Sequence, residues 1–158
     1  MIFESLADLG TYLPKNSRLL GLDVGSKTIG LAVSNSAHTI ATSITTIQRT
    51  KFAQDMENLS AIISEREVSG LVLGLPVSMD GSEGVACQSV RQFAKNVDEK
   101  FEIGIAFWDE RLSTKAIERF LVNEANLSRK RRSEVVDKMA AAYILQGALD
   151  WLKINVPL

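Results

Sequence analysis

The chain has 158 residues, of which 46% are hydrophobic and 23% charged, which is typical of one globular domain that buries its own core. Its formal net charge of −1 gives no overall sign of a nucleic-acid partner, so any such signal must be local. One cysteine and one histidine exclude an intramolecular disulfide and a zinc cluster. No apolar run approaches the roughly 18 residues of a membrane span, and the first residues lack the basic region of a secretory signal. We therefore expect a cytoplasmic protein that makes no membrane contact.

The first third of the chain predicts an antiparallel meander. Residues 1–17 are expected to be an N-terminal extension, with a short helix through Leu6 and a loop from Gly10. Apolar alternation and β-branched residues then predict three strands, at 18–25, 29–34 and 38–47. The turn "GSKT" joins the first two strands into a hairpin.

The remaining sequence alternates helices with strands. Apolar residues at helical spacing predict a helix that begins at Phe52. The later elements are expected as strands at 70–76 and 101–110 and helices at 84–99, 114–125 and 134–152. A meander followed by β-α-β units implies an α/β fold, with a mixed sheet flanked by helices.

Asp23 stands between two apolar residues of the first expected strand. A buried carboxylate without a partner is costly. Two explanations are open at this point: the side chain bonds the amides of the following turn, or it binds a cation.

Further acids follow the last strand and begin the last helix. Successive strand residues point to opposite faces, so one of Asp109 and Glu110 is explained as a solvated residue. Asp137 shares a helical face with Ala141 and Ile144, the face that should meet the sheet. A position near the helix N-terminus would explain the charge of Asp137, but not its alignment with an apolar stripe.

Asp23, Asp137 and one of Asp109 and Glu110 could converge at one end of the sheet. Two carboxylates about 4 Å apart repel by about 4 kcal/mol at an effective dielectric of 20. Three such groups would raise one another's pKa or require a cation. Oxygen ligands favour Mg²⁺ or Mn²⁺, so we predict a metal site formed by these acids.

Basic residues lie on both sides of these acids in the sequence. The run "SRKRRSE" precedes the Asp137 helix, as a solvated loop or as a phosphate-binding segment. The predicted nucleic-acid-binding residues are Lys27, Arg111, Arg129, Lys130, Arg131 and Arg132. The lone histidine, His38, has no partners for a catalytic triad and is predicted to be structural, and Cys87 to be a helix-packing residue.

Four ordered motifs carry a family resemblance: "LGLDVGSKTIGLAVS", "LVLGLPVSMDGSEG", "WDERLST" and "VVDKMAAAYILQ". They resemble the YqgF family of RuvX-like Holliday junction resolvases, which are also described as ribosomal RNA precursor nucleases. The match runs from about Arg18 to Leu152. It implies a single RNase H-like domain at 18–158, whose five-stranded mixed sheet has the order 3-2-1-4-5. It also implies Asp23, Glu110 and Asp137 as catalytic, metal-binding acids, and processing of the small-subunit ribosomal RNA precursor.

One feature departs from the wider resolvase superfamily. Related nucleases often carry the second acid on strand 4, beside strand 1, whereas "GLVLGLP" has none. Glu110 follows strand 5 and must lean across roughly two strand spacings of about 4.8 Å each to reach Asp23. Asp80 or Glu83, in the loop after strand 4, could serve instead.

These observations favour a metal-dependent nuclease that hydrolyses phosphodiester bonds. In that hypothesis Asp23 bridges two metal ions about 3.5–4 Å apart, and Glu110 and Asp137 each hold one. The substrate is expected to be the 5′ end of pre-16S rRNA or, alternatively, branched DNA, acted on by a monomer or homodimer. Two other classes stay open: a non-catalytic RNA- or ribosome-binding module, and an actin-like phosphotransferase, although that class needs two such domains.

Overall fold

A computed structural model of the protein describes residues 1–111 and 129–156, and for residues 129–138 it describes the backbone alone. The strands are β1 (Arg18–Val24), β2 (Thr28–Ser34), β3 (Ala41–Gln48), β4 (Val68–Leu75) and β5 (Gly104–Asp109). The helices are α1 (Leu6–Tyr12), α2 (Phe52–Glu65), α3 (Val85–Lys100) and α5 (Arg129–Asn155). The helix expected at 114–125 lies outside the described residues.

The five strands form one mixed sheet in the order β3-β2-β1-β4-β5, which confirms the predicted order. β1 pairs with β2 in antiparallel and with β4 in parallel, and β4 pairs with β5 in parallel. The carboxyl ends of β1, β4 and β5 therefore meet at one edge of the sheet. In open α/β sheets, this edge is where ligands bind.

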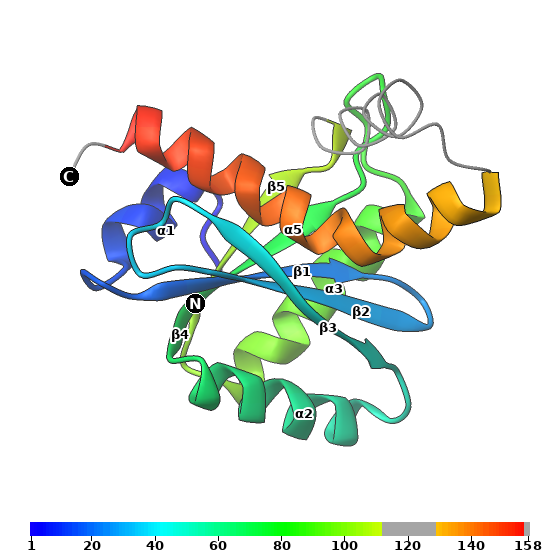
Figure 1. The fold of residues 1–158 in the computed structure, drawn as a ribbon, viewed down its shortest axis with the longest axis horizontal. Coiled ribbons are helices and arrows are strands. Elements are labelled where there is room, and N and C mark those ends of the chain that lie inside the picture. The colour runs from blue at the N-terminus through cyan, green and yellow to red at the C-terminus, as the bar shows by residue number, and fades with distance from the viewer. Residues whose placement is uncertain (112–128, 157–158) are drawn as a thin grey trace.

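Helices cover both faces of the sheet, with α1 and α5 on one face and α2 and α3 on the other (Figure 1). The alternation along β1 divides its side chains between these layers. Leu20 and Leu22 join the core on the α2–α3 side, whereas Leu19 joins the core on the α5 side. By the same alternation, Asp23 belongs to the face that α5 covers.

Gly21 brings α5 close to β1. A Cβ atom at Gly21 would lie 2.7 Å from Cβ of Leu145 and 2.9 Å from the carbonyl oxygen of Ala141. Only a glycine allows the helix backbone this near. Since Asp23 is two residues further along the same strand face, α5 passes directly beside the candidate site.

The first helix is longer than the sequence predicted. Ser5 caps the start of α1 by accepting a hydrogen bond from the amide of Asp8 at 3.1 Å, and the helix continues through Gly10 to Tyr12. A Cβ atom at Gly10 would lie 2.8 Å from the side chain of Leu152, so this glycine permits packing on α5 rather than ending the helix. The predicted loop therefore begins after Tyr12 and not at Gly10.

The last helix also begins earlier than predicted. α5 begins at Arg129, so the basic run forms its first turn and is not the loop that the sequence suggested. Asp137 lies eight residues into α5, more than two turns from its start. The helix dipole acts mainly within the first turn, so it does not explain an acid at this position. Among the described helices, none is long and apolar enough to span a bilayer.

Candidate functional site

Asp23 lies one residue before the end of β1, on the central strand of the sheet. It pairs with Gly30 of β2 and is half-buried between its neighbours. This position places its carboxylate at the carboxyl edge of the parallel strands, on the α5 face.

Glu110 directly follows β5, and its amide donates to the carbonyl oxygen of Leu75 at 3.0 Å. This bond fixes its backbone beside the end of β4. Its half-buried side chain hydrogen-bonds to Asp23 on the far side of β4. Burial first, then the charges of Asp23 and Asp109, and finally this hydrogen bond raise the pKa of Glu110 to about 7. The two acids thus meet across the strand that separates them.

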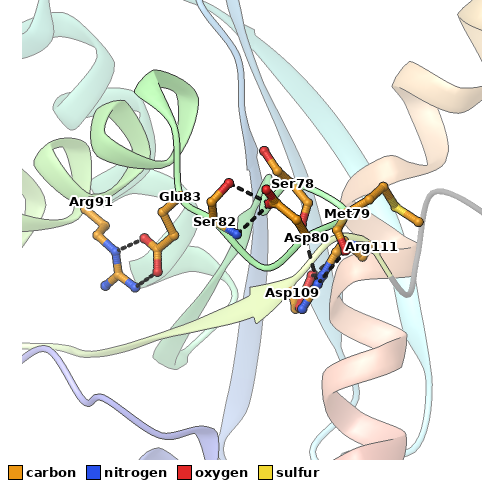
Figure 2. A network of polar contacts seen from close by, with 8 residues as sticks. All are labelled: Ser78, Met79, Asp80, Ser82, Glu83, Arg91, Asp109 and Arg111. Carbon is orange, nitrogen blue, oxygen red and sulfur yellow. Dashed lines mark hydrogen bonds and ion pairs between the residues drawn. The ribbon is translucent and has the colours of Figure 1, made fainter.

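Asp109 lies in an environment that has the opposite effect on its pKa. Its carboxylate accepts from Nε of Arg111 at 3.0 and 2.9 Å and from Nη2 at 2.6 Å, and also from the Arg111 amide at 3.0 Å. These bonds hold the pKa of Asp109 below its usual value. Nη1 of Arg111 also lies 3.4 Å from the carbonyl oxygens of Ser78 and Met79 (Figure 2). Asp109 and Arg111 therefore tie the end of β5 to the loop that follows β4.

The two loop acids bind local partners. Asp80 accepts from the amide of Ser82 at 2.9 Å and from its hydroxyl at 2.6 Å. Glu83 forms a two-bond ion pair with Arg91, at 2.6 and 2.9 Å (Figure 2). These bonds lower the pKa of both exposed acids. Glu110, rather than Asp80 or Glu83, is the acid that the structure shows bonded to Asp23.

Asp137 is located by its backbone alone. It precedes Ala141 by one helical turn, and the carbonyl oxygen of Ala141 lies against Gly21 of β1. Its side chain lies outside those that the structure describes. Within the described residues, no group of three or more His, Cys, Asp or Glu could hold a metal ion. The structure thus brings together two of the three predicted ligands and leaves the third a prediction.

The predicted basic residues fall in three places. Lys27 is exposed in the turn after β1, and Arg111 is paired with Asp109. Residues 129–132 form the first turn of α5, and their side chains are not described. Arg49, which the sequence gave no reason to select, holds the Lys27 turn: its amide donates to the carbonyl oxygen of Lys27 at 2.8 Å and its Nη1 to that of Gly25 at 2.6 Å.

His38 and Cys87 have structural positions, as predicted. Nε2 of His38 lies 2.7 Å from the carbonyl oxygen of Ser17, which joins the β2–β3 connection to the start of β1. Cys87 is fully buried in α3.

Residues 17–151 of this chain, which include both acids of the site, match the family described as "RuvX: Holliday junction resolvase". The chain belongs to the RuvX family. It is 62% identical over 144 residues to a Paramagnetospirillum magneticum protein named "Putative pre-16S rRNA nuclease", a match covering 91% of this chain and 92% of the relative. A Ruegeria pomeroyi protein of the same name is 56% identical over 153 residues, covering 97% of this chain and 99% of the relative. These RuvX relatives confirm the resemblance found in the sequence and support nuclease activity.

Solved structures confirm the RNase H-like fold of this RuvX chain. A structure titled "Thermus thermophilus RuvC structure" matches with a TM-score of 0.51 at 8% identity, over 86% of this chain and 96% of that one. A structure of T. thermophilus RuvC with a Holliday junction substrate gives 0.50 at 9% identity, over 88% and 96%. At such low identity the likeness concerns the fold alone.

Proposed function

We propose that this RuvX chain is a metal-dependent endonuclease that processes the 5′ end of pre-16S rRNA. The observation that carries the proposal is the contact between Asp23 in β1 and Glu110 directly after β5, two acids at the ligand-binding edge of the sheet. Two carboxylates held in one half-buried place repel each other when both are ionised. The proposed substrate, pre-16S rRNA, is taken from the names of the relatives.

The donor set fits a hard divalent cation. The oxygens of Asp23 and Glu110 are ligands that Mg²⁺ and Mn²⁺ prefer. A cation would favour the ionised form of Glu110, whose pKa is raised by burial first and then by the charge of Asp23. Asp23, Glu110 and Asp137 would hold the metal, in the two-metal arrangement of the hypothesis drawn from the sequence. When bound, such ions activate the attacking water and stabilise the leaving oxygen.

The remaining residues would bind and orient the nucleic acid. Lys27 extends from the turn directly after β1, and residues 129–132 begin the helix that carries Asp137. Cationic side chains at these places would contact phosphates and hold the scissile bond over the acids. We expect the enzyme to work in the cytoplasm, as a monomer or homodimer.

Cleavage of defined substrates tests this function. Purified protein is incubated with labelled pre-16S rRNA in Mg²⁺, in Mn²⁺ and in EDTA, with Asp23→Asn as the matched inactive control. We expect cleavage by the wild type in either metal, and none in EDTA or with the variant. Equal cleavage by wild type and Asp23→Asn would contradict the assignment of the site. RNA binding without cleavage in any metal would favour a non-catalytic RNA-binding module.

A second candidate is resolution of branched DNA, which the description of the matching family favours. The acids would perform the same hydrolysis, because RNA and DNA present the same phosphodiester group. A four-way DNA junction, tested beside the rRNA precursor at equal concentration, separates the two substrates by their relative cleavage rates. A parallel nucleotide-binding measurement tests the actin-like alternative, for which we expect no binding.

A further inference from the structure

The contact between Asp23 and Glu110 requires the Glu110 side chain to pass over β4. β1 and β5 are two strand spacings apart, because β4 lies between them. Each spacing is about 4.8 Å, so a residue on one of these two strands normally meets side chains of β4 and not those of the other strand. Something in β4 must leave this path open.

The open position is Gly74. Leu22 pairs with Leu73, so Asp23 and Gly74 are each one residue further along their parallel strands. A Cβ atom added to Gly74 would lie 2.7 Å from Oε1 of Glu110 and 2.9 Å from its Cδ. Both distances are shorter than a Cβ atom tolerates, so the Glu110 carboxylate occupies the space that any other residue's side chain would fill.

Two neighbours limit how far Glu110 could retreat. Its amide is bonded to the carbonyl oxygen of Leu75, which fixes its backbone. The side chain of Ile144 lies on the same spot from α5, with its Cδ1 2.5 Å from the added Cβ atom. An added methyl group would therefore press on both Glu110 and Ile144.

We propose that Gly74 is a positioning residue of the nuclease site, whose missing side chain lets Glu110 cross β4 and share one site with Asp23. The consequence for metal binding rests on the function proposed above. The geometry itself does not, because it concerns a contact between two side chains of the metal-free protein. The same contact explains how this chain can take its second acid from β5 although β4 carries none.

The test needs a variant in which only the path of Glu110 is blocked. Gly74→Ala is combined with Ile144→Val, which removes Cδ1 and makes room for the new methyl group on the α5 side. Ile144→Val alone is the matched control. Gly74→Ala with Ile144→Ala is a second version that gives the methyl group more room, should the first one unfold. Gly70→Ala, on the same face of β4, is a control for general destabilisation, since its Cβ would lie 2.8 Å from the side chains of both Leu13 and Leu19.

The first readout is a double-mutant cycle of Asp23→Asn and Glu110→Gln, measured by denaturant unfolding in EDTA at a pH where both acids are ionised. The cycle reports the direct interaction of the two side chains without metal or substrate. We expect a clear coupling in the Ile144→Val and Gly70→Ala backgrounds. In the Gly74→Ala backgrounds the coupling should fall toward zero. Unchanged coupling there would overturn the role of Gly74, whatever the effect on activity.

The second readout is Mn²⁺ binding by calorimetry. Losing a group that orients a metal ligand typically weakens affinity by about 10- to 100-fold, so we expect a loss in this range for Gly74→Ala with Ile144→Val. Ile144→Val and Gly70→Ala should bind like the wild type. Equal Mn²⁺ affinity in all four proteins would overturn the link between Gly74 and the metal. If the wild type binds no Mn²⁺ while the cycle still loses its coupling, the inference stands and the proposed metal site fails.

Discussion

Asp109 and Glu110 are neighbours in the chain, yet their pKa values move in opposite directions. Arg111 binds Asp109 through both carboxylate oxygens and lowers its pKa. Burial and the charge of Asp23 raise that of Glu110 to about 7. Two acids separated by one peptide bond therefore have different tasks, one as an anchor of the loop after β4 and the other as a member of the acid pair.

The stability of the metal-free protein should fall as the pH rises toward 7. Glu110 has a higher pKa folded than unfolded, so the folded state binds more protons between about pH 4.5 and 7 and loses stability there. A shift of this size corresponds to about 1–3 kcal/mol at high pH, once screening at a half-buried site is allowed for. Glu110→Gln removes this loss. It should match the wild type at about pH 4 and be more stable at about pH 8, measured by urea unfolding in EDTA.

Asp109→Asn is the natural control for this titration. The pKa of Asp109 is lowered in the folded state, so its contribution is present at neutral pH and is lost as the pH falls below its usual value near 3.8. This variant should be less stable than the wild type at neutral pH and approach it in acid. If Glu110→Gln and Asp109→Asn showed the same pH dependence, the opposite environments of the two acids would be contradicted.

The acids should also differ in their effect on cleavage. Glu110→Gln should reduce cleavage as much as Asp23→Asn, because each removes a charge that the metal needs. Asp80→Asn and Glu83→Gln should have much smaller effects, since these acids bond Ser82 and Arg91 instead. Single-turnover cleavage with each folded variant ranks them. A larger loss for Asp80→Asn or Glu83→Gln than for Glu110→Gln would mean that the loop supplies the second acid.

Much of the fold could be predicted because its signals are local. Apolar alternation located β1, and the change to helical spacing located the start of α2 at Phe52. The length of α1 was not predicted, because a glycine in sequence indicates the end of a helix. In the structure, Gly10 lies within the helix, and its lack of a side chain lets Leu152 pack against it. The early start of α5 was missed because a run of charges carries no apolar periodicity.

In the candidate site, too, one part could be predicted from the sequence and another could not. Asp23 was conspicuous as an acid between apolar residues, and the contact of Glu110 with it was anticipated from the family resemblance. The role of Gly74 in that contact was not anticipated, because it depends on the lack of a side chain in β4, the strand between the two acids. Gly74 sits in a buried apolar strand and has no chemical signature. A glycine in β4 at the level of Asp23 becomes meaningful only when the strand order is known.

Arg111 should act first as an anchor of the loop. Arg111→Lys keeps the charge but loses the fork that binds both oxygens of Asp109. We expect faster amide hydrogen exchange at Ser78 and Ser82 in this variant, with an unchanged salt dependence of RNA binding. Arg111→Ala should speed exchange equally and, if Arg111 also contacts phosphate, reduce the salt slope by about 0.7. Unchanged exchange in both variants would show that the loop does not depend on Arg111.

The basic first turn of α5 should bind phosphate without regard to sequence. Neutralising phosphates releases counterions, so the logarithm of the binding constant falls linearly with the logarithm of salt concentration, by about 0.7 per contact for single strands. Replacing Arg131 and Arg132 with alanine should reduce this slope by up to about 1.4 if both contact phosphate. Alanine also favours the helix, so the backbone of α5 should be kept.

Binding to different RNA sequences should weaken about equally, because phosphate contacts carry no sequence information. Cleavage should recover at high protein concentration, since the acids are untouched. A matched control is Lys95→Ala with Lys100→Ala, which removes two charges from α3 on the opposite face of the sheet and should leave the slope unchanged. Titrations at several salt concentrations compare the three proteins. Equal slopes for all three would mean that Arg131 and Arg132 face solvent and that α5 contributes to the site through Asp137 alone.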